Sequence, residues 1–246
     1  MAKIAIVIYS MYGHVATLAE AEKKGIEAAG GQVDLYQVPE TLPQEVLTKM
    51  HAAPKRDYTI ATADALRNYD GIIFGIPTRY GNFPGQFKSF IDTTGSLWQE
   101  GALSGKYVAL FISTGTMGGG QESTAIAAMS TFAHHGLIYV PLGYKHAFPI
   151  LADLSEVRGG SPWGAGTFAG ADGSRSPSAK ELELAEIQGK MFYETVAKAY
   201  GSADNTPAAV EGTSAPARNG ASAVRKKERK EKEAGPCGLP GNCVVT

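Results

Sequence analysis

Apolar runs alternate with helix-like segments along the first 200 residues. Five runs have the short, apolar character of strands, and they occupy residues 3–8, 32–38, 71–76, 106–112 and 137–142. Four segments have apolar residues at helical spacing, at residues 15–29, 84–98, 120–135 and 178–199. Residues 39–69 form an irregular, helix-containing excursion with three prolines, and residues 143–177 form a long glycine-rich connection.

This order predicts an α/β fold with a doubly wound, five-stranded parallel sheet and helices on both faces. In such sheets ligands bind beyond the carboxyl ends of the strands, where the winding reverses. The loops after residues 3–8, 71–76 and 106–112 are therefore the places to look for a site.

Composition changes after residue 200. Residues 201–246 contain no aromatic residue and are rich in Ala, Gly, Ser and Pro, which predicts a disordered polar tail after a single domain over residues 1–200. A basic run at Arg225–Lys230 lies in this tail.

The overall composition excludes several classes of protein. The formal net charge of the 246 residues is −1, which gives no indication of nucleic-acid binding. No apolar run approaches the roughly 20 residues that cross a bilayer, and no signal peptide is recognisable. The two cysteines, Cys237 and Cys243, have no metal-ligand spacing and cannot staple the domain. We expect a cytoplasmic protein without a metal site.

The loop after the first strand contains Ser10, Met11, Tyr12, Gly13, His14 and Val15 but no Lys or Arg. A helix that begins here offers unpaired N–H groups and the positive end of its dipole. The hydroxyls of Ser10 and Thr17 add donors, so the loop could hold a phosphate monoester without a cation. The Walker and GxGxxG patterns are absent. The alternative is a turn that only starts a helix.

The other two loops combine small residues with planar or polar ones. Residues 77–85 (PTRYGNFPG) offer an aromatic ring, a cation and accessible backbone N–H groups, and residues 113–120 (STGTMGGG) offer hydroxyls and glycines. These features suit the faces and edges of a flat heteroaromatic ring, although each loop alone could be an ordinary turn. One phosphate and one large ring indicate flavin mononucleotide (FMN).

Six motifs in order resemble the WrbA family of flavodoxin-like NAD(P)H:quinone oxidoreductases over about residues 1–200. They are SMYGH at 10–14, PTRYGNFPGQ at 77–86, STGTMGGGQE at 113–122, AHHG at 133–136, VRGGSPWGAGTFAG at 157–170 and DGSRSPS at 172–178. The resemblance implies a flavodoxin-like fold, FMN as cofactor, and NADH or NADPH as co-substrate. It further implies homodimers that pair into homotetramers, with the flavin site shared between neighbouring subunits.

The resemblance assigns roles to individual residues. The phosphate falls to residues 10–15. The isoalloxazine ring falls to Pro77, Thr78, Arg79, Tyr80, Gly81 and Asn82, and to Ser113, Thr114, Gly115, Thr116, Met117, Gly118 and Gly119. Trp98 and Tyr80 match aromatic residues that line the substrate cavity, and His134 matches a histidine that reaches the flavin. His134 and Tyr12 are the candidates for donating to the quinone oxygen. Without the resemblance, His134 would be read as a structural residue at a helix end, and Trp98 as a core residue or an oligomer contact.

The resemblance implies a two-electron, ping-pong reduction of quinones to hydroquinones that protects against oxidative stress. The alternative is an electron carrier of the flavodoxin type that docks a protein partner. Such carriers tend to be strongly acidic, and the near-neutral charge of this chain argues against that role. A regulatory protein without turnover is a third alternative.

The chain ends in Cys243-Val-Val-Thr, which has the form of a prenylation box with an unusual last residue. Cys237 could carry a second acyl chain, and the basic run lies upstream, so the tail could attach peripherally to the plasma membrane. The other interpretation is an unmodified, solubilising tail.

Overall fold

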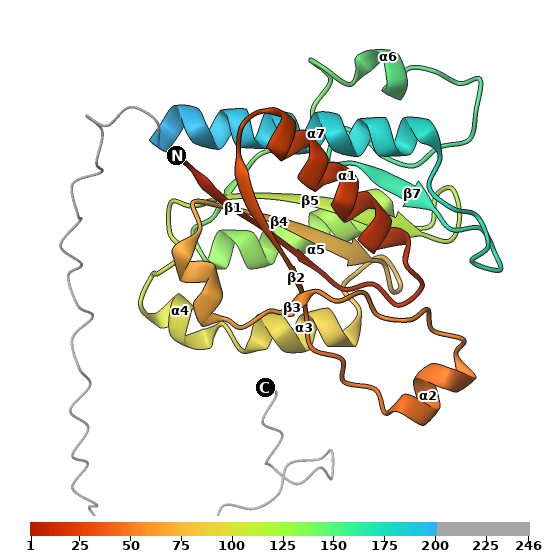
Figure 1. The fold of residues 1–246 in the computed structure, drawn as a ribbon, viewed down its shortest axis with the longest axis horizontal. Coiled ribbons are helices and arrows are strands. Elements are labelled where there is room, and N and C mark those ends of the chain that lie inside the picture. Colours follow the sequence, from red (N-terminus) through yellow and green to blue (C-terminus); the bar gives the residue numbers. More distant parts are fainter. Residues whose placement is uncertain (201–246) are drawn as a thin grey trace, which may run out of the picture. The chain divides into compact units, whose positions relative to one another are not determined.

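A parallel sheet is the centre of residues 1–200, the part of the chain that the computed structural model describes (Figure 1). Its seven strands are β1 (Lys3–Ile8), β2 (Gln32–Gln37), β3 (Thr59–Ile60), β4 (Gly71–Pro77), β5 (Tyr107–Thr114), β6 (Ile138–Tyr139) and β7 (Gly166–Phe168). Their order is β3-β2-β1-β4-β5-β6, and β7 also pairs with β5. The chain moves outward from β1 in both directions, so the doubly wound prediction is confirmed.

Helices cover both faces of this sheet. They are α1 (His14–Ala28), α2 (Gln44–Lys49), η1 (Asp64–Asn68, a 3₁₀ helix), α3 (Gly85–Asp92), α4 (Gly95–Gln99), α5 (Gln121–His134), α6 (Phe148–Leu151) and α7 (Ala179–Tyr200). Helices α1 and α7 lie side by side on one face, and α3, α4 and α5 lie on the other (Figure 1). Helix α2 belongs to the excursion between β2 and β4.

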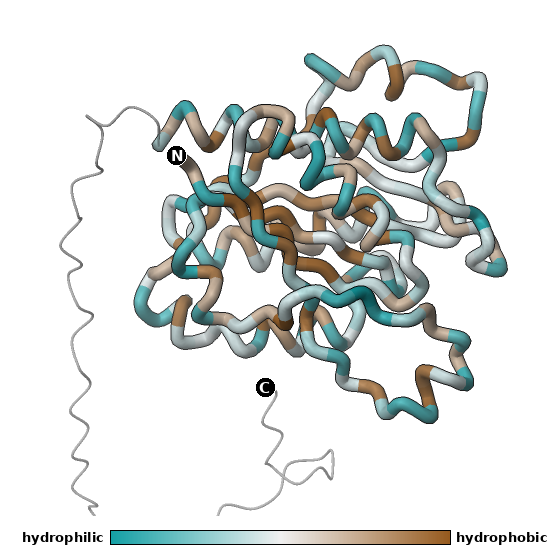
Figure 2. The backbone as a smooth tube through the Cα atoms, viewed as in Figure 1, coloured by the Kyte–Doolittle hydropathy of each residue, from teal (hydrophilic) through white to brown (hydrophobic). Residues whose placement is uncertain are grey.

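The central strand β1 contributes to two separate hydrophobic cores. Ile4, Ile6 and Ile8 pack with residues of α1 and α7, whereas Ala5 and Val7 pack with residues of α3 and α5. Successive strand residues point to opposite faces, so a strand covered on both faces is apolar throughout. The hydrophobic colouring of the central strands in Figure 2 shows this pattern.

The predicted strand at residues 137–142 is largely replaced by two shorter ones. Only Ile138 and Tyr139 form strand β6, which pairs with the start of β5. The end of β5 pairs instead with β7, which follows the long glycine-rich connection. This edge of the sheet is therefore shared by two segments far apart in the sequence, which the hydrophobic pattern of either one does not reveal.

The predicted helix at residues 84–98 is interrupted after Asp92. Helices α3 and α4 are separated by Thr93 and Thr94, whose hydroxyls donate to the carbonyls of Phe90 and Ile91 at 2.7 and 2.6 Å. Threonine side chains that bond to backbone in this way compete with helix continuation.

Within residues 1–200, none of the helices is both long and apolar enough to span a membrane. The predicted polar tail, with its basic run and its two cysteines, lies outside the described residues.

Candidate functional site

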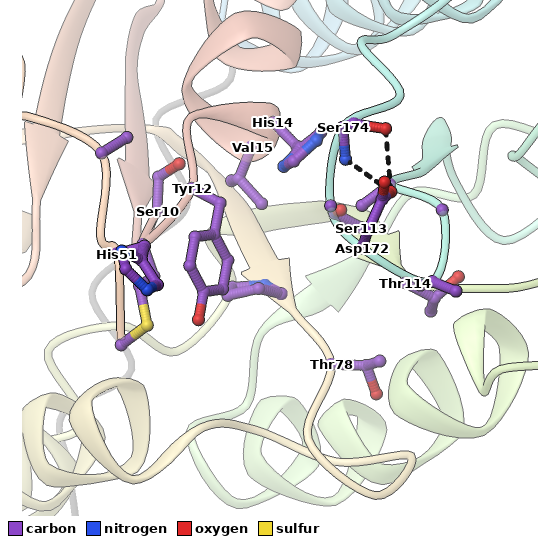
Figure 3. A pocket seen from close by; sticks show the side chains of 18 of the residues that line it. Ser10, Tyr12, His14, Val15, His51, Thr78, Ser113, Thr114, Asp172 and Ser174 are labelled. Carbon is purple, nitrogen blue, oxygen red and sulfur yellow. Dashed lines mark hydrogen bonds between the residues drawn. The ribbon is translucent and has the colours of Figure 1, made fainter. Parts of the chain in front are cut away.

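A cavity of about 520 Å³ opens at the carboxyl ends of the strands, as the winding of the sheet predicts (Figure 3). All three predicted loops contribute to it. The predicted residues that line it are Ser10, Met11, Tyr12, His14, Val15, Pro77, Thr78, Arg79, Ser113, Thr114 and Gly115. The structure therefore brings together the three segments that the sequence pointed to.

The loop between β1 and α1, residues 10–15, presents unpaired backbone donors. Gly13 is the N-cap of α1 and has φ +90°, a left-handed conformation that favours glycine. Within residues 1–200, no hydrogen bond takes the N–H of Met11, Tyr12 or Gly13. The Ser10 hydroxyl accepts from the N–H of Ala16 at 3.2 Å, so it can still donate its own proton. We call residues 10–15 the phosphate loop.

Two residues near this loop lie differently from the prediction. The Thr17 hydroxyl donates to the Gly13 carbonyl at 3.1 Å, and Thr17 does not line the cavity, so its predicted role as a phosphate donor is wrong. Gly13 lines a smaller hollow on the other side of the loop. Its contribution is to shape the turn.

Arg79 brings a positive charge to the wall of the cavity. Its guanidinium donates to the Thr78 carbonyl at 3.1 Å and lies 3.8 Å from the sulfur of Met11. No ion pair joins it to a carboxylate of the described residues. The Arg79 side chain therefore spans from the loop after β4 to the phosphate loop, and its charge is available to an anionic ligand.

The end of the loop after β4 turns away from the cavity. Arg79 and Asn82 exchange backbone hydrogen bonds of 2.9 and 3.0 Å around Tyr80 and Gly81, which have φ +53° and +72°. Two positive φ values are the signature of a type I′ hairpin turn. The Tyr80 side chain is fully exposed. Tyr80, Gly81 and Asn82 thus lie outside the cavity of their own chain.

The loop after β5 also has one part that lines the cavity and one part that lies outside it. Ser113, Thr114 and Gly115 line the cavity, whereas residues 116–119 turn away through a bond of 3.0 Å from the Gly119 N–H to the Thr116 carbonyl. The Met117 side chain is largely exposed. Thr116, Met117, Gly118 and Gly119 therefore do not reach the cavity of their own chain.

His134 and Trp98 lie together, but in a separate surface hollow between α3, α4 and α5. The Nδ1 atom of His134 is 2.9 Å from the carbonyl of Ser130, so this nitrogen carries the proton in the neutral ring and Nε2 is an acceptor. Trp98 is 59% exposed, which is unusual for so large an apolar side chain. Neither residue reaches the cavity of its own chain.

Two groups of cavity residues were not predicted. Met50, His51 and Ala53 come from the excursion after β2, and residues 169–174 come from the long connection before α7. His51 has φ +53° and lines the same cavity as Tyr12 (Figure 3). The cluster Gly170-Ala-Asp-Gly-Ser could have indicated a second ligand-facing turn, but no pattern in residues 50–53 indicates a site.

The segment at residues 169–174 continues the pairing of β7 along the loop after β5. The N–H groups of Ala169 and Gly170 donate to the carbonyls of Thr114 and Gly115 at 2.8 and 2.9 Å. Asp172 accepts from the backbone and hydroxyl of Ser174 (Figure 3), and these hydrogen bonds lower the pKa of its carboxyl. Within the described residues, no group of three or more His, Cys, Asp or Glu is placed to hold a metal ion.

A parallel doubly wound sheet with a phosphate loop and a cavity at its carboxyl edge defines a flavodoxin-like fold with a candidate nucleotide site. The solved structure of a flavodoxin, WrbA-like protein from Agrobacterium tumefaciens has the same fold, with a TM-score of 0.55. It is 21% identical and covers 80% of this chain and 99% of its own.

Sequence comparison shows the family to which the chain belongs. The model of the NADPH-dependent FMN reductase family matches residues 3–147. Protoplast secreted protein 2 of Saccharomyces cerevisiae is 64% identical over 198 residues, which are 80% of this chain and 100% of that protein. An NAD(P)H quinone oxidoreductase of Candida albicans is 62% identical over 196 residues, 80% of this chain and 98% of its own. This chain belongs to the NADPH-dependent FMN reductase family.

Proposed function

We propose that this chain binds FMN in the cavity and, with NADH or NADPH as electron donor, reduces quinones to hydroquinones. The observation that carries the proposal is the meeting of the phosphate loop with two ring-framing loops at one edge of the sheet. Relatives about 60% identical to this chain are named NAD(P)H quinone oxidoreductases, which supports the same reaction here. No observation favours the alternative of an electron carrier.

The phosphate loop fits a phosphate monoester. The unpaired N–H groups of Met11, Tyr12 and Gly13 and the Ser10 hydroxyl are neutral donors at the N-terminus of a 15-residue helix, where the dipole favours an anion. Residues 10–15 include no Asp or Glu, so the loop itself carries no negative charge that would repel a phosphate. These residues would hold the FMN phosphate.

The opposite part of the cavity fits a flat, polar ring. Backbone groups of Pro77 to Arg79 and of Ser113 to Gly115 would hold the ring edge, and the Arg79 charge would favour the anion that develops on reduction. FMN, when bound, supplies the acceptor for a hydride and returns two electrons to the quinone. The protein's own contribution is to hold this group, leave one face open to both substrates, and stabilise negative charge.

Tyr12 is our candidate within one chain for a donor to the quinone oxygen. Tyr12 lines the cavity and is 42% exposed, so its hydroxyl can meet a substrate that enters from solvent. It would also contact the nicotinamide nucleotide.

His134 and Trp98 would act in the site of a second copy. Their common hollow is exposed in the single chain, and it places the apolar Trp98 ring beside the Nε2 acceptor of His134. A homodimer or homotetramer that seats this hollow against a neighbour's cavity would bring the His134 acceptor and an apolar wall to the quinone. Such an assembly would also bring the exposed Tyr80 and Met117 of the turned-away loops close to the ring.

Steady-state turnover tests the proposal. FMN-reconstituted protein is expected to oxidise NADH or NADPH only when benzoquinone is added, with parallel lines in double-reciprocal plots because the two substrates use one open face in turn. Trp98→Ala is expected to raise KM for the quinone more than KM for the nucleotide. Nucleotide oxidation independent of quinone would contradict the proposal.

A further inference from the structure

The phosphate loop itself contains no Lys or Arg, yet two cations from another part of the chain contact its outer side. They belong to residues 53–56 of the excursion after β2, which we call the brace. The Lys55 ammonium donates to the Ser10 carbonyl at 3.1 Å. The backbone N–H of Ala53 donates to the Met11 carbonyl at 2.9 Å. Two consecutive carbonyls of the loop are thus held by residues of the brace.

Arg56 contacts the other end of the same turn. Its guanidinium donates to the Thr17 hydroxyl at 3.0 Å and to the Ala16 carbonyl at 3.4 Å. It also lies 3.6 Å from the Glu20 carboxylate. The brace therefore forms hydrogen bonds to both the phosphate loop and the first turn of α1.

The direction of these contacts affects which backbone groups of the phosphate loop can face the cavity. A trans peptide group places its carbonyl and its N–H on opposite sides. Because the carbonyls of Ser10 and Met11 point to the brace, the N–H groups of the two following residues, Met11 and Tyr12, point away from it. A cation at the carbonyl end also polarises the peptide and makes the N–H a stronger donor.

Lys55 is itself held in place by three groups: the Ser10 carbonyl, the Glu40 carboxylate and the Tyr9 ring. Its ammonium pairs with the Glu40 carboxylate at 3.0 Å and lies 4.6 Å from the centre of the Tyr9 ring. The Tyr9 hydroxyl donates to the same carboxylate at 3.0 Å. Partial burial alone would raise the pKa of Glu40, but the hydrogen bonds from Lys55, the Leu42 N–H and Tyr9 outweigh it and lower that pKa. The Lys55 charge is therefore fixed in position rather than free in solvent.

We infer that Lys55 and Arg56 are positioning residues for a phosphate monoester: they orient the N–H groups of the phosphate loop and supply the positive charge that the loop lacks. This inference rests on the proposed binding of FMN. It assigns to the excursion a role in ligand selection, in which the brace favours the charged FMN over riboflavin, the same ring without its phosphate.

The test compares FMN with riboflavin by the quenching of their fluorescence on titration with apoprotein. Lys55→Gln and Arg56→Gln are measured singly and together, with Lys55→Arg as the conservative variant. Lys24→Gln is the matched control, because Lys24 forms an exposed ion pair with Glu186 and does not touch the loop. Melting temperatures of the apoproteins identify any variant that is not folded, and the single variants then carry the comparison.

The double variant is expected to bind FMN about 10-fold more weakly, the combined effect of two partly screened charges, and riboflavin less than about 2-fold more weakly. Lys55→Arg should keep most of the FMN affinity, Lys24→Gln should change nothing, and added salt should weaken FMN binding more in the wild type than in the double variant.

Equal losses for FMN and riboflavin would overturn the inference, because the brace would then only support the fold. Unchanged affinity for both ligands would overturn it as well. Failure of the wild-type protein to bind FMN at all would instead overturn the proposed function.

Discussion

Arg175 and Glu181 form an ion pair of 2.9 Å in which the carboxylate is fully buried. The carboxylate also accepts from the Thr167 hydroxyl at 2.8 Å and from the Gly159 N–H at 2.7 Å. Arg175 donates in turn to the Phe168 carbonyl at 2.7 Å. The pair thereby joins β7, the start of α7 and the cavity-lining segment at residues 169–174.

Glu181→Gln should destabilise the protein strongly. The substitution removes the negative charge that Arg175 faces and leaves hydrogen-bonding groups around it incompletely paired, which costs about 3–5 kcal/mol of unfolding free energy. Urea unfolding of the apoprotein measures this loss. Because the segment at residues 169–174 loses its anchor, FMN should also bind more weakly to the folded variant.

Asp92→Asn is the matched control for this prediction. Asp92 pairs with Lys88 on the exposed surface of α3, where solvent screens the interaction, so little stability should be lost. If both substitutions changed the midpoint of unfolding by the same small amount, the buried pair would not anchor this part of the chain.

Glu22 makes the stability of the fold depend on pH. Its side chain lies on α1, is fully buried, and neither carboxyl oxygen has a hydrogen-bond partner within the described residues. Burial raises the pKa of this carboxyl well above its ordinary value. The folded state therefore keeps a proton that the unfolded chain releases near pH 4–5. Its contribution to stability is full below that range and is lost as pH rises toward the folded pKa.

Glu22→Gln should remove this dependence. The variant should be more stable than the wild type at pH 8, by roughly 1–3 kcal/mol, and should approach it near pH 4. Urea titrations at several pH values measure the difference. A constant difference across this range would mean that Glu22 does not titrate between its unfolded and folded pKa values.

Gly189 permits the close contact between α1 and α7. A Cβ atom added at Gly189 would lie 2.1 Å from the carbonyl oxygen of Glu22, and one added at Gly25 would lie 2.0 Å from that of Glu186. Both obstacles are backbone, so the helices would have to separate. Gly189→Ala should therefore lower the unfolding free energy by about 2 kcal/mol or more, although alanine is the better helix former.

Gly95→Ala provides the comparison, because an added Cβ at that helical glycine meets no atom within 4 Å. It should be neutral or slightly stabilising in the same urea titration. A similar loss for both variants would show that helix packing at Gly189 is not the cause.

The sequence predicted the winding of the sheet because each strand and helix carries its own hydrophobic period. Continuous apolar runs such as Ile4–Ile8 identified strands covered on both faces, and their order identified the edge where ligands bind. The loops after β1, β4 and β5 were found for the same reason. Local pattern and overall topology agree in these segments.

The remaining parts depend on contacts that no local pattern encodes. Strand β7 is only three residues long, so it has no apolar run that would identify it in the sequence. It is stabilised by pairing with the end of β5. Met50 and His51 line the cavity from the excursion after β2, whose brace is bonded to the phosphate loop. Trp98 and His134 lie outside the cavity of their own chain. Their predicted role in the site of a neighbouring subunit therefore stays a prediction.

Anaerobic stopped-flow absorbance of FMN-reconstituted protein tests the proposed reaction most directly. Mixing with NADH or NADPH should bleach the visible band of the flavin, and subsequent benzoquinone should restore it with one quinone consumed for each flavin. The faster nucleotide would identify the preferred donor. Tight FMN binding without bleaching by either nucleotide would contradict the proposed quinone reduction and would favour an electron carrier that receives its electrons from a protein.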